Sequence, residues 1–161
     1  MARTARVIGF QADPDLQRLI EGWVSWLRDE RRYSSHTLDA YVRDLSGFLA
    51  FVAEHQGEQP TRQLLSALKL GDFRAWLARR AGAGLSVTST ARALAAVRTF
   101  YRWAARREYF ENTALNLVRT PRRPQALPKA LSAADAAAAL QVVGSLDERD
   151  WVGKRDTAVL L

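Results

Sequence analysis

The chain contains no cysteine among its 161 residues and only two histidines. The lack of cysteine excludes disulfide bridges, thiolate metal sites and a cysteine nucleophile, and it fits a reducing, cytoplasmic setting. Neither His36 nor His55 has neighbours at metal-ligand spacing, so we expect no metal site. A glycine-rich phosphate loop is also missing, because Gly82 and Gly84 are more simply explained as the end of a helix. We therefore expect no cofactor.

Long apolar runs are missing as well. The run from Val7 to Phe10 is too short for the core of a signal peptide. No uncharged apolar stretch approaches the length of a membrane span. The sequence therefore predicts a soluble, cytoplasmic protein without a membrane partner, and we expect residues 1–12 to form a flexible arm.

Acidic residues are scarce in the middle of the chain, which carries a formal net charge of +7. Residues 84–130 contain nine Lys and Arg against two Asp and Glu, whereas residues 1–83 contain twelve against ten and residues 131–161 three against five. Such a concentration of positive charge is typical of a surface that binds a polyanion. Arginines that are merely solvated remain the alternative.

Apolar residues recur at three-and-four spacing, and no segment shows sustained alternation, so the pattern predicts an all-α protein. Amphipathic helices with short connections favour a compact four-helix-type bundle. The predicted helices cover 13–31, a segment from Ser34 or Ser35 to about 56, the region 61–81 as a short helix and a longer one beginning near Gly71 and Asp72, and 86–107 with Ser86 as N-cap.

Three of the five prolines fall in "TPRRPQALP", which predicts an extended linker over residues 118–130. The linker would follow a core domain at 13–117. Beyond it, Ser132 is placed to cap a helix in "LSAADAAAALQVV", and a second helix is expected near "DERDWVGKRDTAVLL". About thirty residues cannot bury a useful core. Residues 131–161 are thus expected to begin an incomplete second domain, the alternative being a tail packed on the first.

The helix predicted at 86–107 is basic on one side and apolar on the other. On a helical wheel Arg92, Arg98, Arg102 and Arg106 fall within an arc of about 120°, together with Thr88 and Thr99. The apolar side holds Leu94, Val97, Phe100, Tyr101 and Ala104. A major groove admits one α-helix between phosphates that Arg, Ser and Thr can contact.

This pattern predicts binding to duplex DNA. Four phosphate contacts would give a slope of log K against log[salt] of about −3.6. The alternative is that these arginines are solvated or pair with acids on neighbouring helices.

A second candidate surface lies at the start of the helix that follows residue 34. Ser35, Thr37 and Arg43 are placed to hold a phosphate, because a helix N-terminus offers free N–H groups and a favourable dipole. Plain capping is the alternative for the hydroxyl residues. We expect His36 to face solvent.

The same helix carries no visible catalytic constellation. We interpret Asp39 and Asp44 as surface or capping charges rather than a carboxylate pair. Tyr41, like Tyr101 on the basic helix, falls on an apolar stripe and is expected in the core.

Two stretches together resemble a known family. "SSHTLDAYVRDLSGFLAFV", with Tyr41, Arg43, Asp44 and Leu45 after a Ser-x-x-Thr-like opening, precedes "LSVTSTARALAAVRTFYRWAARREYFENTALNLVRTPRRPQALPKALS". In this order they resemble the N-terminal half of Xer-type tyrosine recombinases, the bacterial site-specific integrases, over roughly residues 14–161. One departure is Thr113, where the family usually has proline after the asparagine.

The resemblance implies a SAM-like core-binding domain that grips one face of duplex DNA, followed by a catalytic domain. The family's catalytic arginines, histidines and tyrosine would lie beyond Leu161, so no catalytic residue is assigned to this chain. The parent protein would be an enzyme that exchanges DNA strands through a phosphotyrosyl intermediate, with other recombinase subunits as partners and chromosome dimer resolution as a role. The fragment itself would bind DNA without cutting it.

The residues assigned to DNA contacts are Ser35, Thr37, Arg43, Thr88, Ser89, Arg92, Arg98, Thr99, Arg102 and Arg106, with Arg122 and Lys129 from the predicted linker. Two other classes of function stay open at this point. One is a small helical DNA-binding transcriptional regulator, and the other is a helical scaffold whose arginines meet an acidic protein.

Overall fold

The structure is a computed structural model that describes residues 10–121 and residue 138. The chain divides into two units, 1–123 and 124–161. Arg122, Lys129, most of the expected arm and the helices expected after Ser132 lie outside the described residues. The predicted domain boundaries therefore stay predictions.

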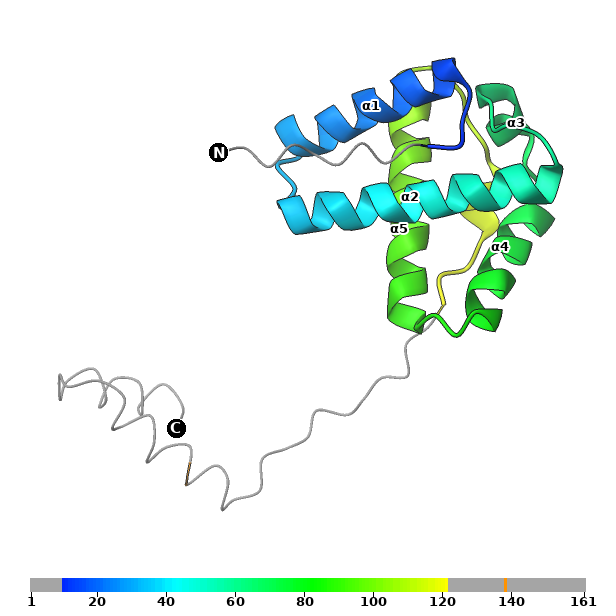
Figure 1. The fold of residues 1–161 in the computed structure, drawn as a ribbon. Coiled ribbons are helices and arrows are strands. Elements are labelled where there is room, and N and C mark those ends of the chain that lie inside the picture. The colour runs from blue at the N-terminus through cyan, green and yellow to red at the C-terminus, as the bar shows by residue number, and fades with distance from the viewer. Residues whose placement is uncertain (1–9, 122–137, 139–161) are drawn as a thin grey trace. The chain divides into compact units, whose positions relative to one another are not determined.

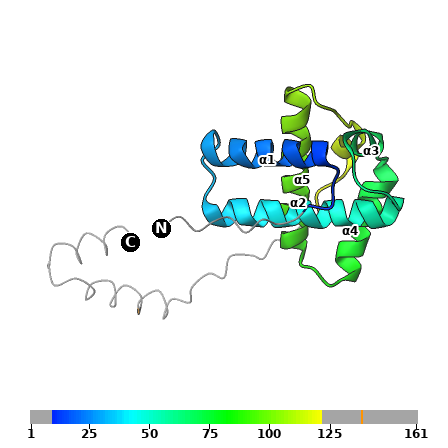
Figure 2. The ribbon, with the colours of Figure 1, turned by 45° about the horizontal axis from the view of Figure 1, so that its top comes forward.

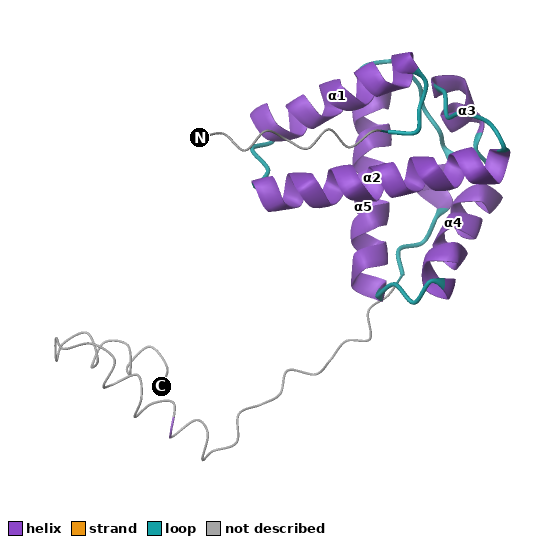
Figure 3. Ribbon diagram, viewed as in Figure 1, coloured by secondary structure: helices purple, strands orange, loops and turns teal. Residues whose placement is uncertain are grey.

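The described part of the chain is helical throughout, and no strand occurs between residues 10 and 121 (Figure 3). This confirms the all-α prediction. The region predicted as one short and one longer helix contains both. The elements are α1 (Pro14–Asp29), α2 (Ser35–Gln56), α3 (Arg62–Ala67), α4 (Leu70–Gly82), α5 (Val87–Arg106) and a short 3-10 turn, η1 (Ala114–Leu117).

Polar side chains fix where the first helices begin. Asp13 accepts a hydrogen bond from the backbone N–H of Leu16 at 3.0 Å, which caps α1. The Ser34 hydroxyl accepts from the N–H of Thr37 at 3.3 Å, so Ser34 rather than Ser35 caps α2. At the other end α2 stops at Gly57, whose φ of +73° is a left-handed conformation that glycine adopts without strain.

Helix α5 lies at the centre of the domain. Figures 1 and 2 show α1 and α2 side by side, with α5 crossing both steeply and α4 lying along the first half of α5. Because α1, α2 and α4 all pack against α5, its apolar side is covered over its whole length. Leu94, Val97, Phe100, Tyr101 and Ala104 are all buried, which confirms the predicted apolar side.

Aromatic side chains fill the space where the helices cross. Trp23 of α1 meets Phe100 of α5 edge to face, with ring centroids 5.6 Å apart. Phe48 of α2 meets Trp76 of α4 in the same manner at 5.0 Å. Burying a large apolar side chain of this kind contributes about 1.5–3 kcal/mol, so this packing fixes the orientation of α5 firmly.

The segment after α5 is held by one amide. The Nδ2 group of Asn112 donates to the carbonyls of Leu65, Ser66 and Leu68 at 3.1, 3.0 and 2.8 Å. Its Oδ1 accepts from the N–H of Ala114 at 2.9 Å. These contacts attach η1 to the last turn of α3 and to its C-cap Leu68, so the segment 112–118 turns back along the domain even with threonine at position 113.

Candidate nucleic-acid interface

The arginines of α5 and its C-cap fall into two groups according to whether a carboxylate neutralises them. Arg92 pairs with Asp44, and Arg107 pairs with Glu30 at 3.3 Å. Arg98, Arg102 and Arg106 form no ion pair with any residue between 10 and 121. We call these three side chains the unpaired ridge.

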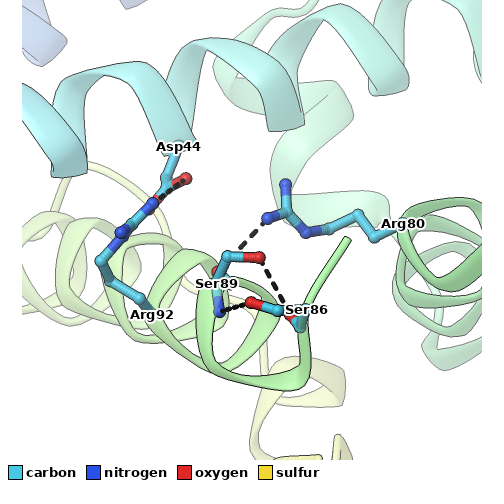
Figure 4. A network of polar contacts seen from close by, with 5 residues as sticks. All are labelled: Asp44, Arg80, Ser86, Ser89 and Arg92. Atoms are coloured by element: carbon cyan, nitrogen blue, oxygen red, sulfur yellow. Dashed lines mark hydrogen bonds and ion pairs between the residues drawn. The ribbon is translucent and has the colours of Figure 1, made fainter. Parts of the chain in front are cut away.

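The ion pair of Arg92 corrects two expectations. Its Nε donates to Oδ2 of Asp44 at 2.8 Å and its Nη2 to Oδ1 at 3.4 Å (Figure 4). Asp44 was expected at the surface, but only 7% of its side chain is exposed. Arg92, expected to project freely, is instead neutralised, because α2 lies across α5 and brings together residues 48 positions apart. The hydrogen bond that Arg92 donates to Asp44, and then the negative charge of Asp44, raise the pKa of Arg92.

Sequence reasoning missed Arg80, which joins α4 to the first turn of α5. Its Nη2 donates to the carbonyl of Ser89 at 3.2 Å, and its guanidinium lies 5.6 Å from the centre of the Trp76 ring. Its buried Nε has no partner among the described residues, and burial lowers the pKa of Arg80. Nothing in the spacing of α4 indicates this contact, since it depends on how α4 meets α5.

Two of the predicted hydroxyl contacts use their hydrogens within α5. Ser89 donates its Oγ hydrogen to the carbonyl of Ser86 at 2.9 Å, while its N–H is capped by the Ser86 hydroxyl at 3.1 Å (Figure 4). Thr99 donates to the carbonyl of Ala95 at 2.7 Å. A phosphate accepts hydrogen bonds and therefore needs a donor. Because both hydroxyl hydrogens are already donated to backbone carbonyls, neither hydroxyl can donate to a phosphate in this conformation. Thr88 is exposed.

The unpaired ridge occupies the second half of α5. Arg98 donates from Nη1 to the Thr120 hydroxyl at 2.7 Å and from Nη2 to the carbonyl of Val118. Arg102 donates from Nε to the carbonyl of Arg98 at 3.3 Å, and the rest of its fork makes no hydrogen bond within residues 10–121. Arg106 is exposed. Partial burial, and then the charge of Arg102, lower the pKa of Arg98, although an arginine keeps its charge at neutral pH.

The spacing of the ridge suits a linear anion. Arg98, Arg102 and Arg106 recur every four residues, which places neighbours about 6 Å apart and the outer two about 12 Å apart along the helix. A groove of about 420 Å³ is lined by Arg98 and Arg102 and by residues after α5, among them Thr113, Asn116 and Glu111, whose carboxylate forms no ion pair with either arginine. Sequence reasoning missed this groove, because η1 forms it only by turning back beside α5.

The start of α2 presents a second set of predicted contacts. Ser35 and Arg43 are exposed, and neither side chain has a hydrogen-bond or ion-pair partner within residues 10–121. His36 is exposed, as expected. The Thr37 hydroxyl lies 2.9 Å from the Ser34 hydroxyl, so it takes part in the cap.

No group of three His, Asp or Glu side chains between residues 10 and 121 is arranged to hold a metal ion. None of the described helices combines the length and apolar character that crossing a bilayer requires.

The fold and the ridge together have the form of a helical nucleic-acid-binding domain, in which one central helix is docked by its apolar side and exposes a line of uncompensated arginines. The family model "Phage integrase, N-terminal SAM-like domain" matches residues 20–108. The chain belongs to this family, and the predicted Xer-type tyrosine recombinase resemblance is confirmed.

Curated relatives agree with this assignment. The chain is 45% identical over 152 residues to "Tyrosine recombinase XerC" of Rhodospirillum centenum, covering 94% of this chain and 45% of the relative. Proteins of the same name from Mesorhizobium japonicum and Methylobacterium nodulans are 39% and 42% identical, with 92% and 91% of this chain and 48% and 46% of the relatives covered. The chain thus spans about half the length of the curated relatives it matches. No solved structure matches it.

Proposed function

We propose that this domain binds duplex DNA for a site-specific tyrosine recombinase and that the unpaired ridge is its main phosphate contact. The observation that carries the proposal is the contrast within one helix. Asp44 and Glu30 neutralise Arg92 and Arg107, whereas no carboxylate between residues 10 and 121 pairs with the ridge. Uncompensated guanidinium groups on a rigid helix attract and orient a phosphate chain.

Further contacts are proposed around the ridge. Thr88 in the first turn of α5 and Ser35 and Thr37 in the first turn of α2 carry hydroxyl groups near helix N-termini, where an anion is favoured. Arg43 adds a guanidinium group two turns further along α2. Arg122 and Lys129 add positive charge directly after the described segment. We give Arg92 a secondary role because Asp44 neutralises its charge, and Ser89 and Thr99 because each donates its one hydroxyl hydrogen to a backbone carbonyl.

The parent protein would then be a recombinase with its catalytic residues outside this sequence. By the family resemblance it would exchange strands through a phosphotyrosyl intermediate, act with other recombinase subunits on DNA, and resolve chromosome dimers. Its place would be the bacterial cytoplasm, where the chromosome lies. The relatives favour this function over a transcriptional regulator or a protein scaffold, since those named above are all tyrosine recombinases.

The test is a titration of labelled duplex DNA with the wild-type chain and the Arg102→Ala/Arg106→Ala variant. Losing two phosphate contacts should weaken binding and make the slope of log K against log[salt] shallower by about 1.8. Arg74→Ala is the matched control, because Arg74 is an exposed arginine on α4 outside the ridge. Equal affinity of the double variant and the wild type would refute the proposal, as would an equal loss in Arg74→Ala.

A further inference from the structure

Arg98 belongs to the ridge, but it is also the residue of the ridge that holds another segment of the chain. Its two terminal nitrogens donate to the Val118 carbonyl and to the Thr120 hydroxyl. We call Val118–Thr120 the exit segment, because it lies at the end of the described domain and leads toward the part of the chain after residue 121. No other side chain between residues 10 and 121 donates to the exit segment.

The exit segment has few other attachments. The Val118 side chain is buried, and its N–H donates to the Leu115 carbonyl at 3.3 Å. Arg119 and Thr120 are exposed, and within residues 10–121 the bond from Arg98 is the only hydrogen bond that reaches either of them. The position of the exit segment beyond Val118 therefore depends on this one guanidinium.

The guanidinium has donors to spare. An arginine fork carries five N–H groups, and the exit segment accepts two of them. The remaining N–H groups and the positive charge of the neighbouring Arg102 favour an anion at the same place. A phosphate and the exit segment can thus be held at the same time by one side chain.

We propose that Arg98 is a positioning residue that ties the exit segment to the DNA-binding ridge, so that contact with a DNA phosphate further fixes the direction in which the chain leaves the domain. The phosphate half of this proposal rests on the proposed function, whereas the attachment of the exit segment does not. Binding that immobilises the guanidinium restricts the segment bonded to it, and by linkage an ordered segment favours DNA binding equally.

The attachment is tested on the chain without DNA, by limited digestion with trypsin and mass spectrometry of the cut after Arg119. Cleavage requires the exit segment to detach, and its rate follows the detached fraction when reclosing is fast. Losing two hydrogen bonds to a charged group should raise the rate at least about tenfold in Arg98→Ala. Thr120→Val, which removes one of them, should give a smaller increase. Each rate is divided by that of a matching synthetic peptide, so that changes in trypsin preference cancel.

Arg74→Ala is the control, since it removes the same charge from an exposed site on α4, outside the ridge and without contact to the exit segment. It should be cut at the wild-type rate. Thermal unfolding of each variant establishes that the cut reports local detachment and not loss of the fold. Wild-type cleavage rates in both Arg98→Ala and Thr120→Val would overturn the attachment.

A second measurement tests the coupling, with saturating duplex DNA added to the wild type and to Arg98→Ala. DNA should reduce cleavage after Arg119 by a larger factor in the wild type than in Arg98→Ala. Simple shielding by DNA is the same in both proteins, and only the wild type also has the exit segment restrained through Arg98. An equal factor in the two proteins would overturn the coupling while leaving the attachment intact. Absence of DNA binding by the wild type would refute the proposed function instead, and the digestion of the free chain would still decide the attachment.

Discussion

The ion pair between Asp44 and Arg92 changes the expected salt dependence of DNA binding. Each phosphate that a cation neutralises contributes about −0.9 to the slope of log K against log[salt]. Four free arginines on α5 would contribute about −3.6, but Asp44 already neutralises Arg92. The three residues of the unpaired ridge should therefore contribute about −2.7.

Variants that remove single charges distinguish a contribution of about −3.6 from one of about −2.7. Arg102→Gln should make the slope shallower by about 0.9, since it removes one uncompensated contact. Asp44→Asn/Arg92→Gln removes a cation and its carboxylate together and should leave the slope at its wild-type value. Arg92→Gln alone leaves Asp44 as an uncompensated anion beside the proposed interface, so it should weaken binding, and adding Asp44→Asn should restore it.

Fluorescence anisotropy of a labelled duplex, followed between about 50 and 200 mM salt, gives each slope directly. Urea unfolding of every variant checks that the fold is kept. The reasoning fails if the double variant Asp44→Asn/Arg92→Gln, compared with the wild type, makes the slope shallower by as much as Arg102→Gln does. That result would mean that Arg92 leaves its carboxylate and contacts a phosphate itself.

Three further predictions concern stability. Asn112→Ala should lower the free energy of unfolding, measured by urea denaturation, by about 2 kcal/mol. The carbonyls of Leu65, Ser66 and Leu68 lose the amide donor, and alanine provides no replacement. Gly47→Ala should raise the melting temperature, because Gly47 lies in α2 with open space at its Cβ position and alanine is about 1 kcal/mol more favourable than glycine in a helix. Gly57→Ala should lower the melting temperature, because Gly57 has a φ of +73°, which strains any residue other than glycine. Burial raises the pKa of Tyr101 well above its usual 10.0. The stability linked to its protonated phenol should therefore be complete below about pH 10 and lost as the pH rises further. Unfolding of the wild type and of Tyr101→Phe at about pH 9 and about pH 11 measures this loss.

The apolar pattern predicted which side of each helix is buried, because burial follows from spacing along one helix. The five residues assigned to the apolar side of α5 are all buried, and Ser86 caps the helix as expected. The short helix and the longer one between residues 61 and 82 were also visible in the spacing. Helix ends shifted by a residue or two, as when α1, predicted over 13–31, ends at Asp29. Of the two predicted caps of α2, the structure has Ser34.

The partners of the charged side chains could not be predicted in the same way. Asp44 meets Arg92 across 48 positions, and Arg98 meets Thr120 across 22. A helical wheel places a side chain on one side of its own helix, but it says nothing about which residues of other helices lie opposite. These contacts depend on the angle at which α2 crosses α5 and on the way η1 turns back, and both are set by tertiary packing.

This distinction moves the proposed interface along α5. The wheel groups Arg92 with the ridge, but pairing leaves the uncompensated charge in the second half of the helix, beside the exit segment. That half ends at the negative pole of the helix dipole, where backbone N–H groups are not free to bind an anion. Phosphates there must be held by side chains alone, and the dipole favours cations at this end, so it stabilises the arginines that would do so. The domain would therefore bind DNA close to the point where the chain leaves the domain. This arrangement lets one residue, Arg98, contact a phosphate and hold the exit segment at the same time.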